Sequence, residues 1–150
     1  MNEHEISTLL AAVQAGSMSP ADALRRLKSG PFRPADLGFA QIDHHRRLRQ
    51  GLGEVIYGES KTIEQILAIA AEAGAAGAPV LITRLQPEKS ARLSAEYPAG
   101  RINAAARTFI LHAPAPLGAT PELPHVAIVA AGTSDLPVAE EAVEVCVAMG

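Results

Sequence analysis

The segment from residue 125 to residue 150 places the strongest constraint on how this chain can fold. It runs HVAIVAAGTSDLPVAEEAVEVCVAMG: an apolar strand, a small polar turn and an amphipathic helix. A single strand–turn–helix unit cannot cover its own apolar faces, so we expect it to belong to a doubly wound parallel sheet of several such units. Residues 125–150 are therefore predicted to begin a second domain that this chain does not complete.

The preceding residues alternate between helical and extended patterns, which predicts a small α/β layer domain over residues 1–112. Helices are expected over 5–15, 20–29, 61–74 and 87–98, and strands over 36–43, 54–59, 79–85 and 106–113. Ser19 and Thr62 stand at N-cap positions, and Gln65 completes a capping box with Thr62. Residues 113–124 hold four prolines and predict a stiff linker between the two domains.

Composition excludes several classes of function. The formal net charge is −3 and the chain has no Trp, two Tyr and three Phe, which argues against nucleic acid or anionic lipid as a partner. The N-terminus resembles no signal peptide, and no apolar run reaches about 20 residues. One cysteine excludes a disulfide framework and a cysteine-based zinc cage. These observations predict a soluble, cytoplasmic protein with neither a nucleic-acid nor a membrane partner.

A first candidate site follows the strand of the last unit. Gly132, Thr133, Ser134 and Asp135 stand at a strand–helix junction, where free N–H groups and hydroxyls can bind the phosphate or ribose of a nucleotide. The same residues fit a simpler role, because Ser or Asp often only caps the helix that follows. Cys146 shares a helix face with small apolar residues, opposite three glutamates, which predicts a buried core residue.

A second candidate site is the basic segment from residue 43 to residue 61. Its polar members are Asp43, Arg46, Arg49, Glu54, Tyr57 and Lys61. Clustered arginines can clamp phosphate or carboxylate, although such a cluster is also typical of a solvated turn, and both interpretations stay open. The adjacent pair of histidines is a weak metal signal, since neighbours on an extended strand point to opposite faces. No metal site is predicted. Arg84, directly after a predicted strand, is a further candidate for anion binding.

Two phrases of the sequence resemble one known family. The phrase DHHRRLRQGLGEVIYGESKTIEQI is similar to the LarB signature, in which Asp, two Arg, Glu-Val-Ile-Tyr-Gly and Lys-Thr recur at these spacings. The phrase VAIVAAGTSDLPVAEEA is similar to the start of the second LarB domain, which resembles the PurE-type aminoimidazole ribonucleotide carboxylase. Both occur in the expected order, and together they span most of the chain.

The resemblance implies an enzyme of nickel-pincer cofactor synthesis, in the maturation of lactate racemase. Such enzymes carboxylate the pyridinium ring of nicotinic acid adenine dinucleotide with CO2 or bicarbonate as co-substrate. They also hydrolyse its phosphoanhydride, giving pyridinium-3,5-biscarboxylic acid mononucleotide and AMP. The resemblance implies no tightly bound cofactor, leaves a role for Mg²⁺ open, and implies a homo-oligomer formed through the PurE-like domain.

The resemblance also implies roles for parts of the chain. A cysteine thiolate of the family adds to the pyridinium ring. That cysteine lies late in the PurE-like domain, so we expect it beyond Gly150 and do not assign its role to Cys146. Thr133, Ser134 and Asp135 would face phosphate and ribose, and the six residues of the basic segment would help to build or close the site. This chain alone is therefore expected to be an inactive portion of the enzyme.

Two alternative functions remain open on the sequence alone. One is a non-enzymatic module that binds a nucleotide or another anion, favoured by the absence of a credible nucleophile or acid–base pair. The other is a plain aminoimidazole ribonucleotide carboxylase, which leaves the basic N-terminal segment unexplained.

Overall fold

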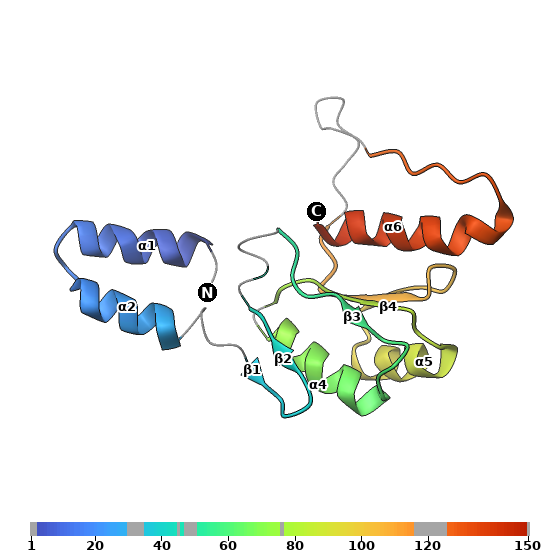
Figure 1. Cartoon of the computed structure of the whole chain (residues 1–150), viewed down its shortest axis with the longest axis horizontal. Helices are drawn as coiled ribbons and strands as arrows, with labels where there is room; N and C mark the ends of the chain where they lie inside the picture. The colour runs from blue at the N-terminus through green and yellow to red at the C-terminus, as the bar shows by residue number, and fades with distance from the viewer. Residues whose placement is uncertain are drawn as a thin grey trace. The chain divides into compact units, whose positions relative to one another are not determined.

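The computed structural model describes residues 3–29, 35–44, 46, 51–75, 77–115 and 126–149. It contains two compact units, Met1–Gly53 and Glu54–Gly150 (Figure 1). Helices occur together with parallel and antiparallel strand pairs, so the predicted α/β class is confirmed. Most of the predicted linker lies outside the described residues, and the division into domains at residues 113–124 stays a prediction.

The first unit begins with two helices, α1 (Glu3–Gln14) and α2 (Pro20–Ser29), which pack against each other. Leu9 of α1 and Ala23 of α2 are buried. The Ser19 hydroxyl accepts a hydrogen bond from the Asp22 amide at 3.1 Å, which confirms Ser19 as the N-cap of α2. The two helices therefore follow from local sequence signals.

A two-stranded antiparallel hairpin follows in the same unit. It joins β1 (Ala35–Asp36) to β2 (Gln41–Ile42), and its turn contains Gly38 at a φ of 80°. The Asp36 carboxylate accepts a hydrogen bond from the Gly38 amide at 2.8 Å, as in an Asx turn. The extended segment predicted over 36–43 is thus a hairpin of two short strands.

The second unit is built on a mixed four-stranded sheet with strand order β3-β4-β6-β5. Its strands are β3 (Ile56–Tyr57), β4 (Val80–Thr83), β5 (Arg101–Asn103) and β6 (Thr108–Leu111). β3 and β4 are parallel, whereas β6 is antiparallel to both β4 and β5. The strand β5 was not predicted, because three residues without apolar alternation give no strand signal.

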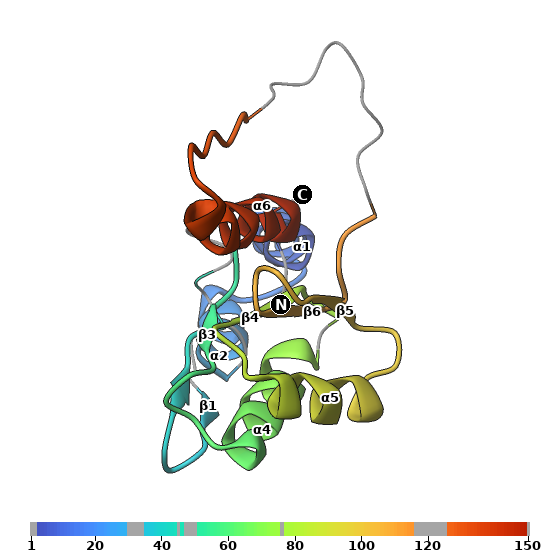
Figure 2. The ribbon, with the colours of Figure 1, turned by 90° about the vertical axis from the view of Figure 1, so that its right-hand side faces the viewer.

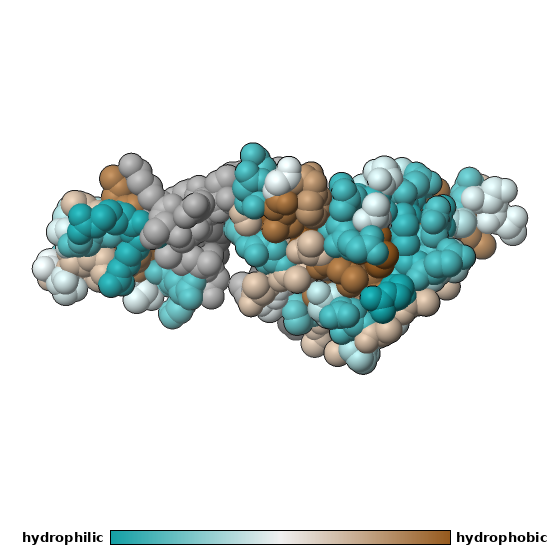
Figure 3. Space-filling model, turned by 90° about the horizontal axis from the view of Figure 1, so that it is seen from below, coloured by the Kyte–Doolittle hydropathy of each residue, from teal (hydrophilic) through white to brown (hydrophobic). Residues whose placement is uncertain are grey.

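Two helices cover one face of this sheet, α4 (Ile63–Gly74) and α5 (Pro87–Glu96) (Figure 2). The predicted capping box at the start of α4 is present, with reciprocal hydrogen bonds between Thr62 and Gln65. Ile66, Ile69 and Leu93 point from these helices into the core. In Figure 3, which shows the side on which α4 lies, hydrophilic residues surround smaller hydrophobic patches.

The opposite face of the sheet is covered by α6 (Leu136–Met149), which follows a short 3-10 helix, η1 (Thr133–Asp135) (Figure 2). All four residues of β4 and all four of β6 are consequently buried. Strands covered on both faces do not alternate in burial, which is why β6 differs from the nearly alternating pattern of its sequence. The second unit thus has three layers: two helices, a sheet and one helix.

Two expectations for the last segment are wrong. Residues 126–131 form no strand in the described part of the chain; Val126 and Val129 are exposed there. Cys146 is exposed instead of buried, because α6 turns its glutamate side to the sheet. The expectation assumed that the apolar side of this helix must face the core. The sheet instead presents Arg84, Arg101 and Asn103, which bind carboxylates.

Candidate functional site

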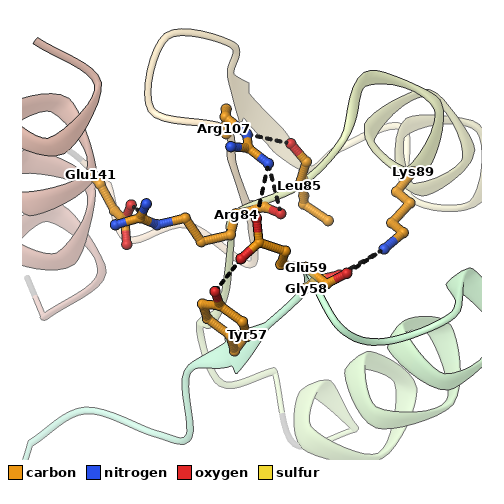
Figure 4. Close-up of polar contacts among 8 residues, drawn as sticks. All are labelled: Tyr57, Gly58, Glu59, Arg84, Leu85, Lys89, Arg107 and Glu141. Atoms are coloured by element: carbon orange, nitrogen blue, oxygen red, sulfur yellow. Dashed lines mark hydrogen bonds and ion pairs between the residues drawn. The ribbon is translucent and has the colours of Figure 1, made fainter. Parts of the chain in front are cut away.

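Three strands of the second unit bring polar side chains to one edge of the sheet. The parallel strands β3 and β4 end there at Tyr57 and Thr83, and Arg84 follows directly. Because β6 is antiparallel to β4, its first residues lie at the same edge, and Arg107 precedes them. Tyr57, Arg84 and Arg107 therefore gather where the parallel strands have their carboxyl ends (Figure 4), the usual position of ligand sites in α/β sheets.

Both arginines of this edge have a left-handed backbone conformation. φ is 55° at Arg84 and 56° at Arg107, a region that costs a side-chain-bearing residue about 1–3 kcal/mol. Hydrogen bonds between the two loops hold this geometry. The Leu85 amide donates to the Arg107 carbonyl at 2.8 Å, and Arg107 Nε donates back to the Leu85 carbonyl at 3.0 Å. Strain of this kind concentrates at functional sites, and two strained arginines side by side make this edge the candidate site.

Glu59 links the two sides of the edge. The Tyr57 hydroxyl donates a hydrogen bond to its carboxylate, and Arg107 Nη2 lies 4.0 Å from Glu59 Oε1. The hydrogen bond to Glu59 is the main reason why the pKa of Tyr57 is raised from its ordinary value of 10.0; slight desolvation and the Glu59 charge raise it further. Tyr57 thus remains a neutral hydrogen-bond donor throughout the physiological pH range.

The loop that carries Glu59 is fixed from two directions. Lys89 of α5 donates to the carbonyls of Gly58 and Glu59, at 2.8 and 3.2 Å (Figure 4). The Gly58 amide donates to the Thr83 carbonyl at 2.8 Å, which continues the β3–β4 pairing. A Cβ at Gly58 would lie 2.9 Å from Leu85 Cδ2, so this close approach requires glycine.

We call Tyr57, Glu59, Arg84, Lys89 and Arg107 the edge cluster. It contains three cationic side chains and one carboxylate, and the arginine side chains are 40% and 42% exposed. Guanidinium groups present a planar set of donors that matches phosphate and carboxylate. The edge cluster is therefore suited to bind an anionic ligand at the surface of the sheet.

The structure places the predicted site residues in different positions. Tyr57 and Arg84 belong to the edge cluster, and Lys61 lies half-buried in the turn that leads into α4. Glu54 lies before β3, at the amino end of that strand. Of the other predicted residues, Asp43 and Arg46 lie in the first unit, where the Arg46 amide donates to the Asp43 carbonyl, and Arg49 lies outside the described residues.

The predicted nucleotide site at Gly132–Asp135 is exposed and forms the start and body of η1. Gly132 is the N-cap of η1 and, as a glycine, has no side chain to cap it. The Asp135 amide donates to the Gly132 carbonyl at 3.0 Å. Within the described residues, no polar contact joins Thr133, Ser134 or Asp135 to the edge cluster. Their role in binding phosphate or ribose stays a prediction.

Sequence reasoning missed Arg107 and Lys89. Both positions depend on packing between segments far apart in the sequence, since Arg107 reaches the edge only through antiparallel pairing of β6 with β4. The only local signal for Arg107 was its position just before a buried strand. That position does not indicate at which edge of the sheet the strand begins.

The described residues hold neither a metal-binding cluster nor a helix fit to span a membrane. No group of three or more His, Cys, Asp or Glu side chains is arranged to hold a metal ion there. None of the helices in those ranges combines the length and apolar character that a membrane span needs.

Comparison with known proteins places the edge cluster within one family. The family model described as the LarB/PurE-like N-terminal domain matches residues 34–113, which is more than half of the chain. A search of the curated proteins found no match. The matched residues include both parallel strands, β6 and every member of the edge cluster. The chain therefore belongs to the LarB family through its LarB/PurE-like N-terminal domain.

Proposed function

We propose that this chain takes part in carboxylating the pyridinium ring of nicotinic acid adenine dinucleotide, with hydrolysis of its phosphoanhydride, in nickel-pincer cofactor synthesis. Membership of the LarB family supports a carboxylase-like function at the level of the family. The substrate and the two reaction steps are the finer proposal, and they rest on the resemblance of residues 43–66 and 126–142 to LarB proteins.

The proposed reaction balances with water and CO2 as the only co-substrates. The carbon of CO2 bonds to C5 of the ring, and the proton that C5 carried is released. Water attacks one phosphorus of the phosphoanhydride, which breaks the P–O bond and yields AMP and pyridinium-3,5-biscarboxylic acid mononucleotide. A nucleophile that adds to the ring and leaves again makes the carbon electron-rich without net oxidation or reduction.

The edge cluster is the observation that supports a binding role for this chain. The dinucleotide carries a ring carboxylate and two phosphates, which are the groups that guanidinium side chains bind best. Arg84 and Arg107 offer two such side chains at the carboxyl ends of the parallel strands, from a strained backbone that fixes their origin. Lys89 holds the neighbouring loop through its carbonyls. We propose that the arginines bind the anionic groups of the dinucleotide.

The first experiment measures turnover and binding separately. The purified chain is incubated with nicotinic acid adenine dinucleotide and isotope-labelled bicarbonate, and mass spectrometry is used to search for AMP and a labelled mononucleotide. A form extended by any residues that its gene encodes after Gly150 is assayed beside it. Calorimetric titration gives the affinity of each form for the dinucleotide.

Variants test the role of the edge cluster. Arg84→Ala and Arg107→Ala are each expected to weaken dinucleotide binding about tenfold or more, because each removes charge-assisted hydrogen bonds. Arg92→Ala is the matched control, since Arg92 is an exposed arginine of α5 and takes no part in the hydrogen bonds and ion pairs described for the cluster. Equal affinities for all three variants would contradict the proposed binding role.

The pattern of products separates the candidate functions. Product from the extended form alone supports the carboxylase and a supporting role for these 150 residues. Product from this chain alone would make the exposed Cys146 the nucleophile to test, by Cys146→Ser. Binding without product in either form would favour the non-enzymatic module, and turnover of aminoimidazole ribonucleotide instead would favour the plain carboxylase.

A further inference from the structure

The sheet face under α6 mixes polar and apolar side chains. Side chains of directly paired residues lie on the same face of a sheet, so Thr108 and Asn103 share a face, as do Ile110 and Arg101. Arg101 and Asn103 bond glutamates of α6, which identifies this face as the one that α6 covers. The hydroxyl of Thr108 is buried there with no hydrogen-bond partner. This interface therefore combines buried aliphatic residues, Leu81 and Ile110, with buried polar groups, one of them without a partner.

Three glutamates attach α6 to this face. Glu144, whose side chain is only 4% exposed, pairs with Arg101 at 2.5 Å and accepts from Asn103 at 3.0 Å. The third contact is made by Glu141, which pairs with Arg84 Nε at 2.8 Å (Figure 4). The remaining glutamate, Glu140, accepts from Asn103 at 2.9 Å. A set of polar contacts thus fixes the position of the helix.

The outer side of α6 is apolar. Leu136, Val138 and Met149 are each at least half exposed. Part of the apolar surface of α6 therefore stays outside the core, although Leu81, Ile110 and Ala148 are buried where the helix meets the sheet. Ion pairs as exposed as Arg84–Glu141 contribute little stability, so an alternative partner can displace them at small cost.

The contact between Glu141 and Arg84 connects this helix to the edge cluster. We propose that α6 is a displaceable cover, and that its Glu141 carboxylate competes with the anionic ligand for Arg84. The inference rests on the proposed function, in which Arg84 binds an anionic group of the dinucleotide. A carboxylate and a phosphate bind the same donors of a guanidinium, so Arg84 cannot satisfy both fully at once. Ligand binding then releases the end of α6 that carries Glu141, and α6 in its docked position lowers the affinity of the site.

Glu141→Gln tests the competition, because it removes the charge and keeps the size of the side chain. The probes are nicotinic acid adenine dinucleotide and inorganic pyrophosphate, titrated into the whole chain. We expect Glu141→Gln to tighten binding of both about two- to fivefold, the range of a partly exposed ion pair. Glu140→Gln is the matched control, since Glu140 lies on the same helix but bonds Asn103, and its affinity should equal that of the unaltered chain.

Two further measurements tie the effect to Arg84 and to the helix. In an Arg84→Gln background, Glu141→Gln should no longer change the affinity, because the contested group is gone. Hydrogen exchange of residues 136–149 should become faster in Glu141→Gln, and also faster in the unaltered chain once ligand is bound. Circular dichroism confirms that each variant is folded.

The outcomes separate this inference from the proposed function. If the unaltered chain binds dinucleotide and Glu141→Gln does not bind it more tightly, the competition is wrong and the proposed function stands. If Glu140→Gln tightens binding equally, the effect comes from the loss of a negative charge on α6 in general and not from competition for Arg84. That result would also overturn the inference. If only pyrophosphate binds, and the variants change its affinity as expected, the proposal that α6 is a displaceable cover is supported. The proposal that the ligand is the dinucleotide is then wrong. If neither probe binds to any form, both proposals are wrong.

Discussion

Glu59 is the residue on which the electrostatics of the edge cluster converge. Its carboxylate accepts from the Tyr57 hydroxyl and lies within ion-pair distance of Arg107. Because this carboxylate lies between them, it keeps the Tyr57 phenol neutral and holds the Arg107 guanidinium in place. The positive charge available to a ligand at this edge is therefore set by Glu59 as much as by the arginines themselves.

The raised pKa of Tyr57 is testable with one background change. The chain has two tyrosines, so Tyr97→Phe leaves Tyr57 as the only one. We expect its tyrosinate absorbance to develop above the ordinary value of 10.0, and Glu59→Gln to lower the midpoint by removing the accepting carboxylate. Glu88→Gln, at an exposed glutamate of α5, should leave the midpoint unchanged.

The sign of the linked stability follows from the direction of this shift. Because folding raises the pKa of Tyr57, the Tyr57–Glu59 hydrogen bond contributes to the stability of the folded chain. That contribution is fully present below pH 10 and is lost as the pH rises through the raised pKa. Glu59→Gln should therefore change the alkaline limb of the stability profile more than the neutral range. A midpoint for Tyr57 at or below 10.0 in the unaltered Glu59 background would contradict the hydrogen bond.

Among the elements, the junction between α5 and β5 depends on one glycine. A Cβ at Gly100 would overlap the Phe109 ring of β6, which is fully buried. The ring therefore packs directly on the backbone where the chain enters β5. No larger residue fits at this position unless the core of the second unit moves.

Gly100→Ala should accordingly destabilise the chain by about 2 kcal/mol, the usual cost of overpacking a filled core. Gly132→Ala is the matched control, because a Cβ there meets only Asp135 Oδ2, at 3.4 Å, and the site is exposed. Its effect should stay within about 0.5 kcal/mol. Urea unfolding of both variants measures the difference, and equal losses of stability would contradict the packing described.

Elements with local signals could be predicted from the sequence, and those fixed by distant contacts could not. The start of α4 was predicted because Thr62 and Gln65 bond each other within one turn. The face of α6 was predicted wrongly, since it depends on Arg84, directly after β4, and on Arg101 of β5, both far away in sequence. The general hydrophobic pattern favoured the opposite orientation, and tertiary ion pairs override it.

The candidate site was predictable to a similar degree. Tyr57 ends one of the two parallel strands and Arg84 follows the other. The carboxyl ends of parallel strands meet at one edge by a general rule, so the sequence indicates both residues. Arg107 needs the antiparallel pairing of β6, and Lys89 needs the packing of α5 beside the loop after β3. The spacing of residues along the chain predicts neither this strand pairing nor this helix packing.

At the scale of the whole molecule, the family match and the α6 contacts concern different parts of the chain. The match ends at residue 113, whereas α6 begins at Leu136 and nevertheless packs on the matched sheet. The edge cluster therefore lies within the family domain, while the helix proposed to control it lies outside. Ligand binding at the edge cluster and its proposed control by α6 would then be separable by changes on either side of residue 113.

The exposure of Cys146 has a practical consequence. It is the only thiol in the chain and it lies on α6, so a maleimide fluorophore should attach once, at a known position, without mutagenesis. We expect the native chain to take up one dye per molecule as readily as the chain in denaturant; labelling that requires denaturant would show that the thiol is covered. The fluorescence of the dye would then report movement of α6 in real time, in a protein with an unaltered sequence.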